Sequence, residues 1–326
     1  MKTLVTGATG FIGTHLVKAL VNEGRDVRCL VRRTSSKSKL ERLGVELAYG
    51  DLLDKDSLKR SLKGVNVIYH LGGEVYSFKV KDYCKVNVQG TKNLLDCLSP
   101  KIERFIYFSS IAAVGPNPNK DRLLTEEDTC IPVTPYGRSK CEAEKIVLES
   151  FRQFKIPVVV IRPPTVYGPG QSQVLVNFFR KVKDGKFYMV GTGEYLRSLC
   201  YIENLIDGVL LAEEKPEAIG KTFFISDKDV YTFKEIVQTI EEVEDKKNSH
   251  FTMTPIIAQS AMLIFNLLQK LFNLNFLSLY TIGTMTMNLG CDISKAENIL
   301  SYKPKVDLKE GLKRTSQYIN SVGNLD

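Results

Sequence analysis

The amino-acid sequence predicts an α/β fold, in which a doubly wound parallel β-sheet is joined to a smaller, mostly helical C-terminal lobe. Through the first half of the chain, short apolar runs alternate with amphipathic helical stretches, which is the pattern of right-handed βαβ units. A glycine-rich turn at residues 7–13 follows the first apolar run. Beyond Ile161, loops rich in proline and glycine break this alternation, which indicates where the second lobe begins.

The elements of the first half follow from composition and spacing. Short β-branched runs that are apolar on both faces predict buried parallel strands, and apolar residues at helical spacing predict the helices between them. The predicted strands are Leu4–Thr6, Val27–Val31, Val45–Ala48, Val67–His70, Phe105–Ser109 and Val158–Ile161. The predicted helices are Phe11–Glu23, Ser57–Leu62, Val86–Leu98 and Tyr136–Phe154.

The second half is less regular. Proline and glycine punctuate residues 162–170, and two further glycines lie in residues 191–193, so we predict loops in both places. The tail from Thr254 onward is expected to be largely helical. The other predicted elements are the helices Val174–Asp184, Ile202–Glu214 and Thr232–Glu242 and the strand Thr222–Ile225.

Composition and charge exclude several classes of function. The 326-residue chain has 45 basic and 37 acidic residues, spread along its length, for a net charge of +8. No DNA-reading motif accompanies them, so we expect no nucleic-acid partner. Seven cysteines stand singly and the three histidines lie far apart, so we expect no metal site and a reducing, cytoplasmic location. The sequence leads directly into the first strand, without the pattern of a signal peptide.

The turn at residues 6–13 has the spacing of a phosphate-binding loop. Gly7 permits a tight turn, Gly10 allows a diphosphate to approach the backbone, and Gly13 allows close packing of the helix on the strand. The helix N-terminus offers free N–H groups to the anion. We therefore predict a dinucleotide-binding Rossmann domain over residues 1–162, with residues 202–226 returning to it. A substrate-binding lobe is predicted over 163–201 and 227–326.

The end of the second predicted strand selects the cofactor. An acidic residue there holds the ribose hydroxyls of NAD, whereas arginine pairs with the 2′-phosphate of NADP. Arg32 and Arg33 follow this strand, Lys39 comes soon after, and no acid lies before Glu41. We expect NADP to be preferred over NAD, the alternative being that this stretch is a solvated basic loop.

Tyr136 and Lys140 form a candidate catalytic pair at the start of a helix. Thr134 is a candidate N-cap and Pro135 a first-turn proline, so the tyrosine and lysine project from one helix face. A lysine ammonium close to a phenol favours the phenolate and lowers its pKa toward working pH. The same ammonium can hold the nicotinamide ribose.

Ser110 lies at the end of the fifth predicted strand. Active sites on open parallel sheets lie beyond the carboxyl ends of the strands, so we expect Ser110 to hydrogen-bond the substrate oxygen. Ser109 is the less favoured choice, and a serine that merely ends the strand is the alternative.

Together these motifs are similar to those of the extended short-chain dehydrogenases/reductases, the NAD-dependent epimerase/dehydratase group, over nearly the whole chain. Some features resemble the dihydroflavonol reductase and 3β-hydroxysteroid dehydrogenase branch. The matching stretches are residues 6–13, 50–52, 87–91, 109–110 with Gly115, Tyr136 with Lys140, 162–170, Arg197 ahead of 201–204, 292–296, 303–304 and 310–312.

The resemblance implies roles for the candidate residues. Tyr136 is implied as the acid/base, Lys140 as a ligand of the cofactor ribose, and Ser110 as the residue that orients the substrate. A further group is implied in cofactor binding, with Asp51 and Leu52 against the adenine. This group comprises Gly7, Thr9, Gly10, Phe11, Ile12, Gly13, Asp51, Leu52, Leu71 and Pro163.

Three basic residues are implied in recognition of phosphate groups. Arg32 and Lys39 match positions that meet the 2′-phosphate in the dihydroflavonol-reductase-like branch. Arg197 resembles the arginine that grips the diphosphate of nucleotide sugars, the alternative being an ordinary salt bridge. The resemblance also implies a homodimer, formed through the predicted helices at 86–98 and 136–154.

Three departures from the family pattern limit this transfer. An isoleucine and an alanine follow Ser110, where sugar-nucleotide 4,6-dehydratases place an Asp-Glu pair, so dehydration chemistry lacks its usual acid and base. Thr165 stands where many nucleotide-sugar enzymes have asparagine. Gly72 and Gly73 replace two alanines, which is expected to loosen the cofactor wall slightly.

Two enzymatic interpretations remain, both with a small-molecule substrate. A nucleotide-sugar epimerase, slightly favoured by Arg197, takes a hydride and returns it. An NADPH-dependent reductase or dehydrogenase of an apolar substrate is favoured by Arg32, Lys39, Thr165 and the apolar stretch 256–279. A third interpretation, a catalytically silent NADP-binding regulator, conflicts with the complete catalytic set.

The stretch Pro255–Leu279 is predicted to be a helix that packs on the substrate lobe and caps its cavity. Lys270 is the one basic residue on its polar side, whereas helices that lie on membrane surfaces are usually rich in lysine and arginine. Asparagines and glutamines interrupt its apolar run, so we expect no membrane insertion.

Overall fold

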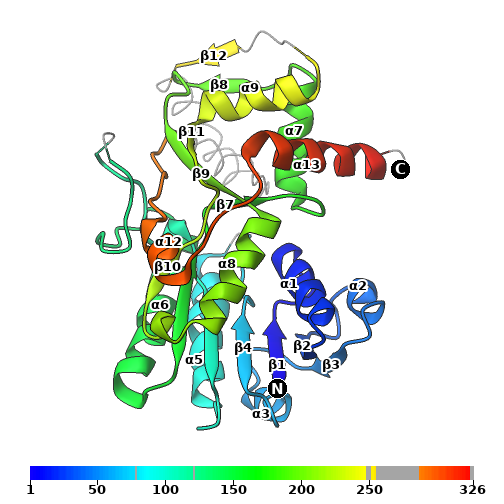
Figure 1. The fold of residues 1–326 in the computed structure, drawn as a ribbon, viewed down its shortest axis with the longest axis vertical. Helices are drawn as coiled ribbons and strands as arrows, with labels where there is room; N and C mark the ends of the chain where they lie inside the picture. The colour runs from blue at the N-terminus through cyan, green and yellow to red at the C-terminus, as the bar shows by residue number, and fades with distance from the viewer. Residues whose placement is uncertain (78, 120–121, 247–250, 255–285, 324–326) are drawn as a thin grey trace.

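The computed structural model describes the chain except for residues 78, 120–121, 247–250, 255–285 and 324–326. The helix predicted over 255–279 therefore lies outside the described residues. Seven strands form one parallel sheet (Figure 1). They are β1 (Lys2–Thr6), β2 (Asp26–Val31), β3 (Glu46–Tyr49), β4 (Val67–His70), β5 (Arg104–Phe108), β6 (Val158–Arg162) and β10 (Thr222–Phe224).

The strand order in this sheet is β10-β6-β5-β4-β1-β2-β3. The direction of winding reverses between β1 and β4, which defines a doubly wound, Rossmann-like α/β sheet. The predicted fold class is therefore confirmed. In such sheets ligands bind beyond the carboxyl ends of the strands at the reversal point.

Helices cover both faces of the sheet, and each face has its own apolar core. Side chains alternate between the faces along each strand. In β6, Val158 and Val160 belong to the same apolar core as Leu58, whereas Val159 belongs to the core that contains Leu16, on the other face. The helices of the first half are α1 (Phe11–Asn22), α2 (Ser38–Glu41), α3 (Lys55–Ser61), α4 (Val80–Tyr83), α5 (Gly90–Asp96) and α6 (Pro135–Phe154).

One predicted helix is interrupted. The segment predicted over 86–98 comprises a π-helical turn, η1 (Cys84–Gln89), followed by α5. A π-helical turn has a wider hydrogen-bond pattern than an α-helix and is frequent at functional sites. Apolar spacing alone does not reveal this local change.

The second lobe is built on two small sheets in the upper half of Figure 1. β9 (Leu196–Tyr201) lies between β7 (Thr165–Tyr167) and β11 (Val230–Thr232), and β8 (Tyr188–Val190) pairs with β12 (Phe251–Met253). Among the described residues after β6, the α-helices are α7 (Gln173–Lys183), α8 (Ile202–Glu214), α9 (Phe233–Val243), α12 (Ser294–Leu300) and α13 (Leu308–Gly323). Within the described part of the chain, no helix has the length and apolarity needed to span a membrane.

A buried carboxylate joins the two lobes. Asp227, which is 1% exposed, accepts hydrogen bonds from the Tyr167 hydroxyl at 3.0 Å, the Tyr201 amide at 2.8 Å and the Asn204 side chain at 2.7 Å. These donors lower the pKa of Asp227, but burial is the larger effect and raises it to about 6. At pH values between about 4 and about 6, the folded state therefore keeps the Asp227 proton. The unfolded chain, whose carboxyl pKa is ordinary, has released it.

We expect this carboxyl group to make the protein less stable as pH rises from about 4 to about 6, because the folded state favours the protonated form. The shift corresponds to on the order of 3 kcal/mol once the group is fully ionised. Urea unfolding of the wild type and of Asp227→Asn across this range measures the effect. The difference between their unfolding free energies should change with pH, and a constant difference would refute the assignment.

Candidate active site

The turn between β1 and α1 leaves no room for side chains. Gly7 has a φ of 69°, and a Cβ there would lie 2.7 Å from the Gly72 amide nitrogen. A Cβ on Gly13 would lie 2.2 Å from the Gly7 carbonyl oxygen. Gly10 is the N-cap of α1. The first turn of α1 is thereby held against the end of β1, as the glycine spacing predicts.

A cavity of about 130 Å³ lies at the N-terminus of α1. Lys39 lines it from α2, and Pro169 and Gly170 line it from the second lobe. The His15 ring contacts the Pro169 carbonyl oxygen through Nε2 at 2.8 Å, so α1 is tied to the loop of the other lobe. The remaining lining residues are Thr9, Gly10, Phe11 and Thr14.

The loop after β2 is rich in exposed cations. Arg32 is exposed. Arg33 lies over the ring of Tyr49 at 5.4 Å, and Lys37 donates to the Tyr49 hydroxyl at 2.8 Å. Among the described residues, no carboxylate forms a salt bridge with any of these cations or with Lys39. An incoming phosphate would therefore compete with no ion pair.

The residues predicted to meet the adenine, Asp51 and Leu52, follow β3, and the loop after β4 lies beside them. Asp51 Oδ1 accepts a hydrogen bond from the Leu53 amide at 2.9 Å, and Leu52 is 8% exposed. A Cβ on Gly72 would lie 3.1 Å from Leu52 Cδ1. The Leu71 amide donates to the Thr6 carbonyl at 3.3 Å, which places this loop beside the glycine-rich turn.

Glycines after β4 tighten this wall rather than loosen it. A Cβ on Gly73 would lie 2.8 Å from Asn87 Oδ1 and 3.5 Å from Lys140 Nζ. The expectation of a looser cofactor wall is therefore wrong, because glycine lets the loop approach α6 and η1 closely.

Lys140 is buried beneath the start of α6. Its Nζ donates to the Phe108 carbonyl oxygen at 2.7 Å and lies 5.0 Å from the ring centre of Tyr107. Burial lowers its pKa to about 8, and the negative charge of Glu144 opposes this shift. Tyr136 precedes Lys140 by one turn and is partly buried, with its ring 6.2 Å from that of Tyr83.

The two serines after β5 differ in their surroundings. Ser109 is 4% exposed, and its hydroxyl donates to Glu144 at 2.7 Å. Ser110 is partly exposed and accepts a hydrogen bond from the Ala112 amide at 3.1 Å. Because the hydroxyl proton of Ser110 is not used in this contact, Ser110 suits the role of donor to a substrate oxygen better than Ser109 does.

Asn87 is a site residue to which the sequence analysis gave no role. It lies in η1 and is 1% exposed. Its Oδ1 accepts from the Glu74 amide at 2.6 Å, and its Nδ2 donates to Ser139 Oγ at 2.8 Å. Ser139 Oγ in turn donates to the Tyr136 carbonyl oxygen at 2.7 Å. Asn87 therefore connects the loop after β4 to the first turn of α6. The family-like stretch 87–91 is the sequence feature that could have identified it.

A buried histidine extends this network to the phosphate-binding turn. Thr91 Oγ1 donates to the Asn87 carbonyl at 2.6 Å and so accepts from His70 Nε2 at 2.9 Å. His70 Nδ1 then accepts from the Thr6 hydroxyl at 2.7 Å. Burial lowers the pKa of His70 to about 3, which keeps the ring neutral.

Two further predicted residues lie beyond β6. Pro163 is buried, and its carbonyl oxygen accepts from the Ile111 amide at 3.0 Å, beside Ser110. Arg197 lies on β9 in the second lobe, opposite Tyr231 of β11. Burial lowers the pKa of Arg197 to about 10, so the guanidinium is charged at neutral pH.

The described residues fit a dinucleotide. The free N–H groups at the start of α1 and the cation Lys39 suit a diphosphate, and the absent glycine side chains let it approach the backbone. Lys140, with Gly73 close to its ammonium group, offers a donor at the end of β4 for a ribose hydroxyl.

Comparison with known proteins gives consistent matches. Residues 3–226 match the model of the NAD dependent epimerase/dehydratase family. The UDP-glucose 4-epimerase of Vibrio cholerae is 30% identical over 330 residues, covering 98% of this chain and 96% of that protein. The 4-hydroxy-2-methyl-3-oxo-4-farnesyl-3,4-dihydroquinoline-1-oxide ketoreductase of Stigmatella aurantiaca is 30% identical over 233 residues, covering 70% of this chain and 68% of that protein.

A solved structure has the same fold over its full length. The UDP-glucuronic acid 4-epimerase of Bacillus cereus, in complex with NAD, superposes with a TM-score of 0.79 at 27% sequence identity. The alignment covers 99% of each chain.

Proposed function

The chain belongs to the NAD dependent epimerase/dehydratase family, and from this premise we propose that it is a nucleotide-sugar 4-epimerase. Enzymes of this family are oxidoreductases that transfer hydride with NAD or NADP. The finer proposal is that a secondary alcohol of a nucleotide sugar is oxidised and then reduced on its opposite face. Net consumption of the cofactor is then zero.

The positions of residues on α6 and at the end of β5 support the proposed roles. Tyr136 exchanges a proton with the reacting oxygen of the substrate, and Ser110 donates a hydrogen bond to the same oxygen. Lys140 stabilises the Tyr136 phenolate by its charge and holds the ribose. When bound, the dinucleotide supplies the hydride acceptor and donor. The turn at residues 7–13, with Asp51, would hold its other end.

The observation that favours a nucleotide sugar is Arg197. A partly buried, charged guanidinium on the central strand of the small sheet can bind a diphosphate through two parallel hydrogen bonds. The similarity to a UDP-glucose 4-epimerase along 98% of this chain supports the same substrate class.

Incubation with UDP-glucose tests this proposal. We expect formation of the C4 epimer, detected by chromatography, without a net change in dinucleotide absorbance. Mass spectrometry of molecules that co-purify with the protein gives independent information, since a retained nucleotide sugar is expected. An enzyme that forms no epimer from any UDP-sugar would contradict the proposal.

The second candidate is an NADPH-dependent reductase of an apolar ketone. The cationic loop after β2 favours it, as does similarity to a ketoreductase whose named substrate carries a farnesyl group. Net oxidation of NADPH with an apolar ketone, together with absence of epimerisation, would establish this alternative. The seven free cysteines fit a reducing cytoplasm for either activity.

We propose NADP as the preferred cofactor, because Arg32 and its neighbouring cations are available to a 2′-phosphate. Fluorescence titration should show tighter binding of NADPH than of NADH. Loss of one charge-assisted contact in Arg32→Ala should narrow this preference roughly tenfold. Arg60→Ala, at an exposed arginine of α3, is the matched control. Equal affinities of the wild type for both cofactors would overturn the preference.

A further inference from the structure

Glu144 is a buried carboxylate on α6, one helical turn after Lys140. Ser109 Oγ donates to its Oε2 at 2.7 Å, and Arg162 Nε donates to the same oxygen at 3.1 Å. A second guanidinium nitrogen of Arg162 bonds its Oε1. The side chains of Arg162 and Glu144 are 5% and 4% exposed. The pair is therefore bidentate and removed from solvent, where charge-assisted hydrogen bonds are strongest.

These contacts fix α6 to the end of β5 at two successive residues. Lys140 Nζ bonds the Phe108 carbonyl oxygen, and Glu144 bonds the side chain of Ser109. Ser110 is the next residue along the chain. Two side chains of α6, one turn apart, thus set the position of Ser110 relative to Tyr136.

Arg162 makes further contacts besides those with Glu144. It donates to the Glu126 carbonyl oxygen at 3.3 Å and to Cys130 Sγ at 3.5 Å, and its guanidinium lies 5.7 Å from the Phe224 ring centre. A pocket of about 340 Å³ borders Arg162.

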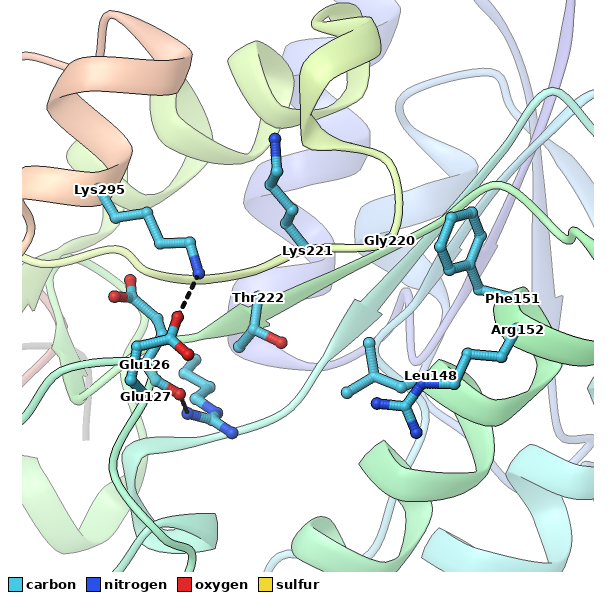
Figure 2. A pocket seen from close by; sticks show the side chains of 10 residues that line it. Glu126, Glu127, Leu148, Phe151, Arg152, Gly220, Lys221, Thr222 and Lys295 are labelled. Atoms are coloured by element: carbon cyan, nitrogen blue, oxygen red, sulfur yellow. Dashed lines mark hydrogen bonds and ion pairs between the residues drawn. The ribbon is translucent and has the colours of Figure 1, made fainter.

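Figure 2 shows that Lys295, another charged residue of this pocket, has an ion-pair partner of its own. Lys295 faces Glu127, with Nζ and Oε1 3.3 Å apart, and Lys221 donates to the Glu217 carbonyl oxygen at 2.6 Å. Glu144 forms its ion pair with Arg162 from β6.

We propose that Glu144 is a positioning residue, which holds α6, β5 and β6 in register so that Tyr136, Lys140 and Ser110 face one reacting centre. This inference rests on the proposed function, because the proposed function defines the reacting centre. Glu144 itself does not contact the reacting atoms. It acts through Ser109 and through the charge that it presents to Lys140.

The electrostatic part of this role has a definite sign. Burial lowers the pKa of Lys140, and the negative charge of Glu144 raises it. His70 and Tyr107, from β4 and β5, also lie near Lys140, but His70 is neutral and burial keeps the Tyr107 phenol protonated. Loss of the Glu144 charge should therefore lower the pKa of Lys140 further and deprive Tyr136 of its cationic neighbour near neutral pH.

The test measures Lys140 without cofactor or substrate. In protein labelled with ¹³C at lysine Cε, the Lys140 resonance is assigned by its loss in Lys140→Arg and then followed by NMR against pH. We expect a midpoint near pH 8 in the wild type, displaced downward by about one pH unit in Glu144→Gln. Glu142→Gln, an exposed site on the same helix, should leave the midpoint unchanged.

A second variant separates positioning from folding. The double variant Arg162→Met with Glu144→Gln removes both buried charges, so that neither charge is left buried without a partner. We expect this double variant to remain folded, yet to show the lowered Lys140 midpoint and at least a tenfold lower turnover. An unchanged midpoint in both variants would overturn the inference. Failure of the proposed reaction alone would leave the NMR result standing, so the two failures are distinguishable.

Discussion

Replacement of Tyr136 by phenylalanine is expected to lower turnover by about 10²–10⁴-fold, the usual contribution of a positioned acid/base. The phenol supplies the proton that the reacting oxygen gains or loses, and phenylalanine keeps the ring but not the hydroxyl. The contacts of the glycine-rich turn and of Lys140 with Phe108 do not involve this hydroxyl. Stopped-flow or steady-state assays measure the effect on turnover. Fluorescence titration of the dinucleotide measures any effect on cofactor binding.

The matched control for this variant is Tyr83→Phe, at the residue whose ring packs on that of Tyr136. The Tyr83 hydroxyl accepts from the Ser77 amide at 2.9 Å, so its loss should disturb the loop after β4 without removing the acid/base. We expect a smaller effect on turnover than in Tyr136→Phe. Near-normal activity of Tyr136→Phe on the true substrate would exclude Tyr136 as the acid/base.

Replacement of Gly13 by alanine is expected to destabilise the protein and weaken dinucleotide binding at least tenfold. Helix propensity alone predicts the opposite, a gain of about 1 kcal/mol. The added Cβ, however, would lie 2.2 Å from the Gly7 carbonyl oxygen and 2.8 Å from Ala8 Cα. These are backbone atoms that cannot rotate away, so α1 must shift from β1. We expect this shift to lower the folding stability by about 1–3 kcal/mol.

Thermal unfolding and dinucleotide titration of Gly13→Ala measure both consequences. Lys18→Ala, on the exposed face of the same helix, controls for a general effect on α1. A Gly13→Ala protein that is more stable than the wild type and binds the dinucleotide normally would show that the turn relaxes without loss.

The sequence predicted local structure best at positions where a residue type has a single physical reason to be present. Glycines spaced over residues 7–13 predicted the phosphate-binding turn, because only glycine leaves the room that Gly7 and Gly13 need. Thr134 and Pro135 predicted the start of α6, and the structure places both as expected. The strands of the large sheet were visible because they are apolar on both faces.

Features that depend on pairing across the fold were not predictable. The strands β7, β8 and β11 have three residues each, too few for a recognisable period. The partners Glu144 and Arg162 are 18 residues apart, and neither has a local signal of the contact. Asn87 was part of a matching stretch, but its hydrogen bonds to Glu74 and Ser139 arise only because η1 turns it inward.

The position of β10 in the sequence, 60 residues after its partner β6, has a consequence for biosynthesis. Val158–Arg162 form β6, and its outer partner Thr222–Phe224 follows only after the chain has crossed the other lobe. Until those residues have been made, β6 presents an open edge composed of consecutive valines and isoleucine, the kind of edge that recruits strands from other chains. A chain that terminates prematurely between these segments should therefore aggregate rather than persist as a partly active fragment.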